Sequence, residues 1–359
     1  MTKVVKIGNL KIGGKNPVRI KGMIKTPHSQ IRKVISEAKR LEKEGAESIR
    51  IAVREDKDTK IAAVLKKHVS VPIVADIHFH YKLALGAIEE GFDGIRLNPS
   101  NISKEIHIRQ VARVAKNYNV SIRVGVNSGG FKKEFANSKQ LADDMVKRVQ
   151  QFLKILEKEN FFDVMVSLKG ADVVSTIIAN EMFSKKFDYP LHLGVTATGP
   201  FLEGVVKSSI GIGSLLSRGI GSVLRVSLAA PSFVEIQVAK HILQSLNLRR
   251  FEPDIISCPT CSRCEVNLIA IVDKCKKELA LRAVDKSLKV AIMGCVVNGP
   301  GEAYQADIGV AFGGKDKAAI FKKDKILGWT DEKRVVGDLM REVTKIKGQG
   351  SGVKGQGRI

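Results

Sequence analysis

Cysteine is absent from the first 257 residues of this 359-residue chain, because all five cysteines lie between residues 258 and 295. Disulfides therefore cannot stabilise the larger part of the molecule. No apolar run reaches the roughly 18 residues that a membrane span needs, and residues 1–8 lack the apolar stretch of a signal peptide. We therefore expect a cytoplasmic protein without a membrane segment.

Acidic residues are scarce relative to basic ones, with 37 Asp and Glu against 60 Lys and Arg, so the net charge is +23. Such an excess suits a polyanionic partner, either nucleic acid or a phosphorylated ligand. Aromatic residues make up only 5% of the chain, and no dense basic run interleaved with aromatics is present. We therefore favour a lysine-rich, solvated surface and do not expect nucleic-acid binding.

The glycine-rich G-x-G-x-x-G turn of a dinucleotide-binding sheet is also missing, which disfavours a doubly wound open sheet. Instead, eight short β-branched runs alternate with amphipathic stretches. The runs cover residues 18–23, 48–53, 73–77, 94–97, 121–126, 164–168, 191–195 and 223–227. Continuously apolar runs suit parallel strands that are covered on both faces. The pattern predicts a (β/α)8 TIM-type barrel over residues 1–250.

The pattern changes near Pro253. A cysteine loop is followed by a predicted helix over residues 264–281, and Thr330 is a candidate cap for a last helix. Predicted strands cover residues 289–293, 307–311 and 319–322. We expect a small α+β domain over residues 251–346, and a basic, glycine-rich, disordered tail over residues 347–359.

Several predicted barrel strands carry a cation inside an apolar run. The cations are Arg50, Arg96, Arg123, Lys169 and Arg225. Side chains near the carboxyl ends of barrel strands face the active-site mouth, where converging cations repel one another unless an anion joins them. The pattern predicts a ligand with more than one phosphate, because arginine binds phosphate through paired hydrogen bonds. Alternatively, local carboxylates such as Asp76 and Asp172 neutralise these cations.

The cysteines have the spacing C-x2-C-x2-C at Cys258, Cys261 and Cys264, and Cys295 follows later. A thiol redox pair leaves the further cysteines unexplained, and a structural zinc site lacks its second ligand pair. The spacing also differs from the C-x3-C-x2-C of radical enzymes that use S-adenosylmethionine. An iron–sulfur cluster is therefore favoured. Cys264 and Cys275 are eleven residues apart, so both can face the core of one helix.

Four motifs resemble one enzyme family. They are C-P-T-C-S-R at 258–263, I-M-G-C-V-V-N-G-P-G-E at 292–302, V-A-D-I-H-F at 74–79 and P-L-H-L-G at 190–194. With these motifs, residues 6–312 resemble the 4-hydroxy-3-methylbut-2-enyl diphosphate synthases of the methylerythritol phosphate pathway. The resemblance implies a barrel followed by an iron–sulfur domain. It also implies a [4Fe–4S] cluster held by Cys258, Cys261, Cys295 and Glu302.

The resemblance assigns site residues in the barrel as well. The implied substrate-binding residues are Arg50, Arg96, Arg123, Asn127, Lys169 and Ser227, and the strand pattern adds Arg225. Asp76 and His78 line the same mouth, and together with Glu302 they are expected to take part in catalysis. The implied reaction opens 2-C-methyl-D-erythritol 2,4-cyclodiphosphate and removes a hydroxyl with two electrons from ferredoxin or flavodoxin. The enzyme is expected to be a homodimer in which the cluster domain of one subunit closes over its partner's barrel.

This chain departs from the family pattern in loops of the active-site face. Ala197 occupies the position of the glutamate in the usual T-E-A-G, and Glu203 is the candidate that replaces it as proton donor from the same loop. Further departures lie at residues 20–26 and 229–232. We expect weakened or altered activity. The alternative is a cluster-bearing relative that binds the ligand or transfers electrons with reduced or no turnover.

Overall fold

The chain divides into two units, Met1–Arg249 and Arg250–Ile359, in the computed structural model. The structure describes residues 1–131, 134–170, 172–196, 198–264, 266–282, 284–295, 301, 303–314, 317–323 and 325–346. The predicted tail, residues 347–359, lies outside these ranges. Each unit is described by itself below.

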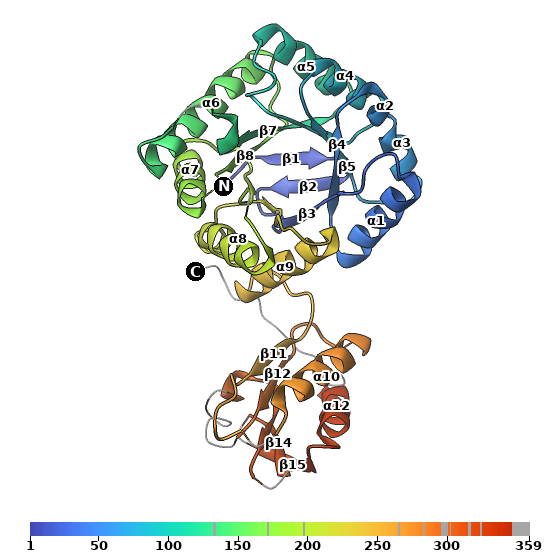
Figure 1. The fold of residues 1–359 in the computed structure, drawn as a ribbon, viewed down its shortest axis with the longest axis vertical. Helices are drawn as coiled ribbons and strands as arrows, with labels where there is room; N and C mark the ends of the chain where they lie inside the picture. The colour runs from blue at the N-terminus through green and yellow to red at the C-terminus, as the bar shows by residue number, and fades with distance from the viewer. Residues whose placement is uncertain are drawn as a thin grey trace. The chain divides into compact units, whose positions relative to one another are not determined.

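Eight parallel strands form the barrel of the first unit (Figure 1). They are β3 (Arg19–Met23), β4 (Ser48–Val53), β5 (Ile73–Ile77), β6 (Gly94–Leu97), β7 (Ser121–Asn127), β8 (Val164–Lys169), β9 (His192–Leu193) and β10 (Val223–Leu224). Neighbours in the barrel are neighbours in the chain, β10 pairs with β3, and a parallel bridge from Val166 to Leu191 closes the ring. The predicted (β/α)8 barrel is confirmed.

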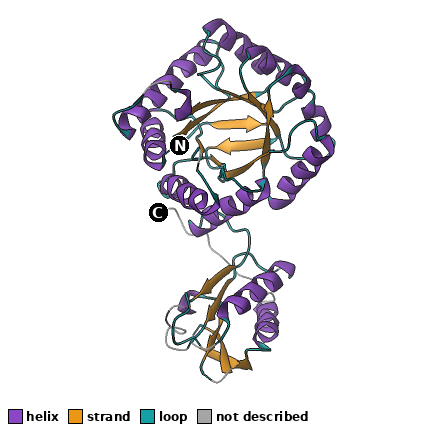
Figure 2. Cartoon of the chain, viewed as in Figure 1, coloured by secondary structure: helices purple, strands orange, loops and turns teal. Residues whose placement is uncertain are grey.

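Helices surround the strands on the outside (Figure 2). They are α1 (Ile31–Glu44), α2 (Asp56–Thr59), α3 (Ile61–Leu65), α4 (Tyr81–Glu89), α5 (Glu105–Asn117), α6 (Ser138–Lys158), α7 (Val173–Lys186), α8 (Phe201–Leu216) and α9 (Ser232–Ser245). In α1, Val34, Ala38 and Leu41 are buried at helical spacing, and the helix ends at Gly45, whose φ of 101° suits glycine. One apolar stripe of this kind fixes which face of a helix packs on the barrel.

Side-chain alternation along β3 determines which residues enter the barrel. A Cβ at Gly22 would lie 3.2 Å from a methyl group of Leu41, so this position faces α1 on the outside. Its neighbours Lys21 and Met23 therefore face the interior, because successive side chains of a strand point to opposite faces.

A hairpin that the sequence did not predict closes the amino-terminal end of the barrel. Its antiparallel strands, β1 (Val4–Ile7) and β2 (Leu10–Gly13), cross the ring in Figure 1. Ile7 and Ile12 are buried against the interior residues Val74, Met165 and Val223. An apolar floor therefore lies beneath the polar interior of the barrel.

The second unit contains a five-stranded mixed sheet in the order β11 to β15. The strands are β11 (Asp254–Ser257), β12 (Lys289–Met293), β13 (Ile308–Phe312), β14 (Lys317–Lys322) and β15 (Lys325–Asp331), with helices α10 (Leu268–Leu281) and α12 (Val335–Ile346). The first three strands are parallel and the last two antiparallel. The predicted α+β class is confirmed, although β11 and β15 were not predicted.

The predicted helix cap at Thr330 is wrong. Thr330 lies in β15, and its hydroxyl donates to the Asp338 carboxylate at 2.6 Å. The side chain therefore joins the last strand to α12 and does not start the helix.

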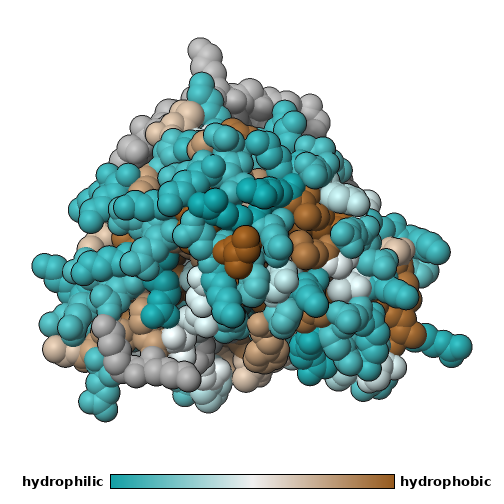
Figure 3. Space-filling view, turned by 90° about the horizontal axis from the view of Figure 1, so that it is seen from above, coloured by the Kyte–Doolittle hydropathy of each residue, from teal (hydrophilic) through white to brown (hydrophobic). Residues whose placement is uncertain are grey.

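In the described part of the chain, no helix combines the length and apolarity of a bilayer span. The face of the molecule shown in Figure 3 is mostly hydrophilic, with small separate apolar patches. On this face the surface is solvated, as expected.

The β1–β2 hairpin should stabilise the barrel through its buried side chains. We expect Ile12→Ala to lower the free energy of unfolding by about 2–5 kcal/mol, because a fully buried side chain is lost and the floor cannot close completely. Calorimetric unfolding of the full chain measures the effect. Val4→Ala in the same hairpin is the control, since Val4 is 49% exposed; equal losses in both variants would contradict the buried role of Ile12.

Candidate active site

Each barrel strand, or the residue directly after it, brings an ionisable side chain to the interior. These side chains are Lys21, Arg50, Asp76, Arg96, Arg123, Lys169 and His192, on β3 to β9 in order, and Arg225, which directly follows β10. The strand register sets Asp76 beside Arg96 and Arg96 beside Arg123. We call Lys21, Arg50, Arg96, Arg123, Lys169 and Arg225 the cationic cluster. Apolar residues usually fill this space in a barrel, so the cluster indicates a site and not a packed core.

Asp76 lies at the centre of one half of the cluster. Its carboxylate is 3.6 Å from Arg50 Nε, 3.5 Å from Arg96 Nη1 and 3.5 Å from His78 Nε2. Burial by itself would raise the pKa of Asp76, but Arg50, the hydrogen bond from His78 and the other arginines hold the pKa well below its usual range. Asp76 therefore remains an ionised carboxylate.

A second carboxylate, which the sequence did not reveal, serves the other half of the cluster. Glu235 comes from α9, is 1% exposed, and lies 3.6 Å from Arg225 Nη2. It also pairs with Lys25 Nζ at 2.8 Å and accepts from the Leu228 amide at 2.8 Å. Burial is the main cause that lowers the pKa of Arg225 to about 10, and the positive charge of Arg50 is the second.

The proposed alternative, in which Asp76 and Asp172 neutralise the strand cations, is only half right. Asp172 caps α7, where it accepts from the Ser175 amide at 2.7 Å. Ser138 also lies within 3.4 Å of its carboxylate. Asp172 is thus committed to starting a helix, because its side chain satisfies free amides of the first turn.

Within the described residues, several buried donors of the barrel interior have no hydrogen-bond partner. They include Lys21 Nζ, Arg123 Nε, Arg123 Nη2, His192 Nε2, Arg225 Nε and Ser227 Oγ. Burial and the neighbouring cations lower the pKa of Lys21, Arg123 and Lys169 well below the ordinary values. Unsatisfied buried donors cost free energy. A ligand with several anionic oxygens would satisfy them.

His192 is a further site residue that was missed, although it belongs to the P-L-H-L-G motif. It is fully buried, and its Nδ1 lies 2.7 Å from Arg123 Nη1. Burial, and then Arg123 and Lys169, lower the pKa of His192 well below 6.5. The imidazole is therefore neutral, with Nδ1 accepting from Arg123 and the proton on Nε2.

A strained turn follows Asp76. Phe79 has a φ of 62°, and the His80 amide donates to the His78 carbonyl at 2.8 Å, so three residues form a γ-turn. Bulky side chains rarely adopt positive φ. The turn fixes His78 beside Asp76 and leaves the Phe79 ring 72% exposed.

The remaining predicted barrel residues differ in position. Asn127 ends β7 in register with Lys169, and Ser227 follows β10. Glu203 was expected in a loop, but it lies in the first turn of α8, where it is exposed. Ala197 and Glu302 lie outside the described residues.

Cysteines of the second unit lie where two neighbouring parallel strands end. Cys258 follows β11, Cys295 lies two residues after β12, and the Gly294 amide donates to Cys258 Sγ at 3.3 Å. The amide and side chain of Arg263 lower the pKa of Cys261. Amide donors directed at sulfur favour the thiolate form that binds iron.

The other two cysteines have different surroundings. Cys264 Sγ contacts the Val266 carbonyl at 3.4 Å, and Cys275 is fully buried on α10. Burial raises the pKa of Cys275 to about 11. Cys275 is thus a core residue of the helix, as predicted. Cys264 does not share that helix, because α10 begins only at Leu268.

Among the described residues, no three cysteine, histidine or acidic side chains lie together in a ready metal site. The donor chemistry nevertheless fits an iron–sulfur group, because Cys258 and Cys261 both receive amide hydrogen bonds.

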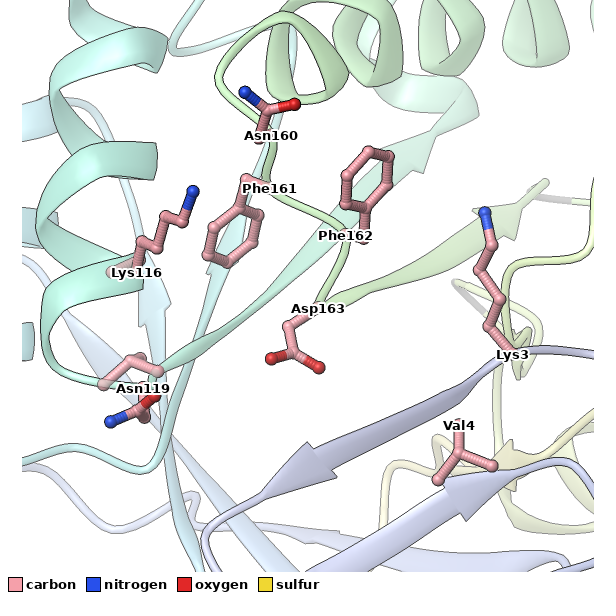
Figure 4. Close-up of a pocket in the computed structure, with 10 residues that line it drawn as sticks. Lys3, Val4, Lys116, Asn119, Asn160, Phe161, Phe162 and Asp163 are labelled. Carbon is pink, nitrogen blue, oxygen red and sulfur yellow. The ribbon is translucent and has the colours of Figure 1, made fainter.

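A cavity of about 430 Å³ lies elsewhere, at the amino-terminal ends of β7 and β8 (Figure 4). Lys3, Lys116, Phe161 and Asp163 are among its lining residues. Barrel active sites occupy the opposite, carboxyl-terminal end of the strands, so we assign no catalytic role to this cavity.

Family comparisons agree with this geometry. The model of the GcpE TIM-barrel domain matches residues 2–240, and that of the GcpE protein C-terminal domain matches residues 254–345. The chain belongs to the GcpE family. The second match covers Cys258, Cys261 and Cys295, and the family consists of iron–sulfur enzymes.

Several curated relatives match over nearly their whole length and carry the name 4-hydroxy-3-methylbut-2-en-1-yl diphosphate synthase (flavodoxin). The protein of Thermodesulfovibrio yellowstonii is 46% identical over 96% of this chain and 98% of its own length. That of Caldanaerobacter subterraneus is 43% identical over 96% of this chain and 97% of its own. A Yersinia pestis dihydropteroate synthase structure, at 12% identity, covers 68% of this chain and 98% of its own with a TM-score of 0.53, which supports the barrel fold alone.

Asp76 should be needed for stability of the ligand-free barrel. We expect Asp76→Asn to lower the free energy of unfolding by about 3 kcal/mol at neutral pH, because Arg50 and Arg96 lose a buried carboxylate. The folded-state pKa of Asp76 is depressed, so its contribution is complete above the unfolded pKa of about 3.9 and is lost as the pH falls through the lower folded value.

Thermal unfolding of both proteins between neutral and acidic pH measures this difference. Asp188→Asn is the matched control, since Asp188 forms an exposed pair with Lys3 at 3.1 Å and should contribute less than about 1 kcal/mol. A difference for Asp76→Asn that persists unchanged in acid would show that ionisation of this carboxyl is not the cause.

Proposed function

We propose that this chain catalyses the reductive opening of 2-C-methyl-D-erythritol 2,4-cyclodiphosphate to 4-hydroxy-3-methylbut-2-enyl diphosphate. It is an enzyme of the isoprenoid methylerythritol phosphate pathway and an iron–sulfur oxidoreductase, as its 41–46% identity to the synthases indicates. The observation that carries the substrate assignment is the cationic cluster, whose buried donors match a ligand with two phosphate groups.

Five residues of the cationic cluster bind the two phosphates. Arg50, Arg96, Arg123, Lys169 and Arg225 supply the charge, and Asn127 and Ser227 at the strand ends supply neutral hydrogen bonds. Phosphate binding neutralises the cations and relieves their mutual repulsion. The free energy gained in this way contributes to the affinity for the substrate. The reaction takes two electrons and the protons that convert the departing hydroxyl to water.

Asp76 and His78 act at the same mouth. Because Asp76 stays ionised, it orients Arg50, Arg96 and His78 and is not itself the acid. His78, with a side chain 33% exposed, and Glu203 on α8 are the candidate proton donors. Ala197 lacks an acidic group, so this chain must take the proton from another residue or from water.

The second unit would hold a [4Fe–4S] cluster through Cys258, Cys261, Cys295 and Glu302. When bound, that group supplies the electrons for the reduction. The hydrogen bond from Gly294 to Cys258 and the Arg263 amide at Cys261 support this ligand set, because each stabilises a negatively charged sulfur. Cys264 and Cys275 are dispensable.

A flavodoxin is the proposed electron donor, since the curated relatives carry this donor in their names; a ferredoxin is the alternative. The net charge of +23 favours association with an acidic donor protein. The cytoplasm is the proposed location, because its reducing conditions keep these thiols free of disulfides.

An exposed apolar face on α8 supports the proposed homodimer. Leu202, Val206 and Ile210 are four residues apart and are 69%, 48% and 51% exposed. Apolar patches of this kind mark interaction surfaces, and the same face on two copies can pair around a two-fold axis.

The activity test is an oxygen-free assay of the full-length protein with the cyclic diphosphate and a strong reductant, in which the diphosphate product is measured. We expect turnover by the natural protein. Arg123→Leu should weaken substrate binding by about 2 kcal/mol or more, because two of its buried N–H groups are available to phosphate. Undiminished binding by this variant would make Arg123 a structural residue.

Two further variants belong to the same assay. Ala197→Glu restores the acid that is usual in the family, and Glu203→Gln removes the candidate substitute. A gain from the first or a loss from the second, on the scale of about 10²–10⁴-fold, identifies the proton donor. If neither variant changes turnover, neither position carries that role.

The cluster ligands are tested by iron content. We expect Cys258→Ser, Cys261→Ser and Cys295→Ser proteins, prepared without oxygen, to lose iron and the visible absorption of the cluster. Cys264→Ser and Cys275→Ser are the matched controls and should retain both, because Cys275 lies in the core of α10 and Cys264 contacts a backbone carbonyl. Loss of iron in Cys264→Ser with retention in Cys295→Ser would instead favour Cys258, Cys261 and Cys264 as ligands, a C-x2-C-x2-C run like that of bacterial ferredoxins.

A further inference from the structure

Lys21 is the most deeply buried member of the cationic cluster. It is 1% exposed, and within the described residues its Nζ has no hydrogen-bond partner. It lies on the inward face of β3, beside Met23 and in register with Ser48 of β4. Arg50 is in register with Met23, two residues further along β3. The Lys21 side chain therefore starts closer to the barrel floor than the side chain of Arg50.

The groups that surround Lys21 are mostly cationic. Arg50 from β4, Arg123 from β7, Lys169 from β8 and Arg225 directly after β10 face the same interior, with neutral His192 from β9. The carboxylate that acts on Lys21 is Asp76, which already serves Arg50 and Arg96. A charged ammonium therefore lacks a carboxylate of its own in the ligand-free barrel, as far as the described residues show.

An apolar side chain at position 21 would destabilise the fold less than lysine does. A methionine has nearly the length of the lysine stem and needs no hydrogen bond, so a purely structural position would tolerate it. Lysine at this position costs stability unless a ligand uses it, and functional residues commonly carry such a cost.

We propose that Lys21 is a further substrate-binding residue, whose ammonium forms the floor of the diphosphate site. This rests on the proposed function. Burial, Arg123 and Arg50 lower the pKa of Lys21 in the free protein, whereas Asp76 raises it only in part. Two phosphate groups add negative charge nearby, which raises the pKa of Lys21 and favours the protonated ammonium.

Calorimetric titration tests the proposal. The full-length protein, prepared without oxygen, is titrated with the cyclic diphosphate at neutral pH in two buffers with different ionisation enthalpies, which gives the number of protons taken up. We expect Lys21→Met to take up fewer protons than the natural protein and to bind at least about tenfold more weakly. Lys21→Gln, which keeps a polar side chain, should behave likewise.

A matched control and a stability measurement separate binding from structure. Lys66→Gln should change neither quantity, because Lys66 forms a partly exposed pair with Asp93 at 2.7 Å. Ligand-free Lys21→Met should melt at an equal or higher temperature than the natural protein. A lower melting temperature with unchanged affinity would make Lys21 a structural residue and overturn the proposal.

Two other outcomes are distinct. Equal affinity and equal proton uptake in the natural protein and both Lys21 variants would overturn the role of Lys21 and leave the proposed function intact. If the natural protein does not bind the cyclic diphosphate at all, the proposed function fails, and the role of Lys21 fails with it.

Discussion

Repulsion among buried cations is the constraint on which the barrel depends. Six lysine and arginine side chains share the interior, and in the described residues Asp76 and Glu235 are the carboxylates that face them. Charges removed from water need partners, and here the partners are too few. The ligand-free barrel is therefore held in a state that favours anions.

The rest of the first unit makes this state tolerable. The β1–β2 hairpin supplies an apolar floor. The buried side chains of Ile7 and Ile12 add hydrophobic stabilisation that the polar interior does not provide. Outside, helices such as α1 pack ordinary apolar stripes against the strands. Neutral His192 accepts a hydrogen bond from Arg123 without adding charge. Stability thus comes from the periphery, and the centre is left for binding.

The second unit favours negative charge, on its cysteine sulfurs. Its loops direct amide groups at Cys258 and Cys261, which favours anionic sulfur. Cys275, by contrast, is buried on α10, where burial raises its pKa and keeps it a thiol. Under the proposed function, one chain carries a cationic site for phosphate and a thiolate site for iron. The two halves of a reductive reaction on a phosphorylated substrate would use these two sites.

The sequence by itself determined the eight strands, the cations within them and the spacing of the cysteines, because strand periodicity and motif spacing are local properties of the chain. It did not reveal Glu235, which reaches Arg225 from α9, nor Lys21 and His192, whose importance depends on strand register across the ring. It also misplaced Glu203 in a loop and Asp172 beside the cations. These contacts are determined only in the closed barrel. Tertiary packing sets which face of each strand points inward and which charges far apart in the chain become neighbours.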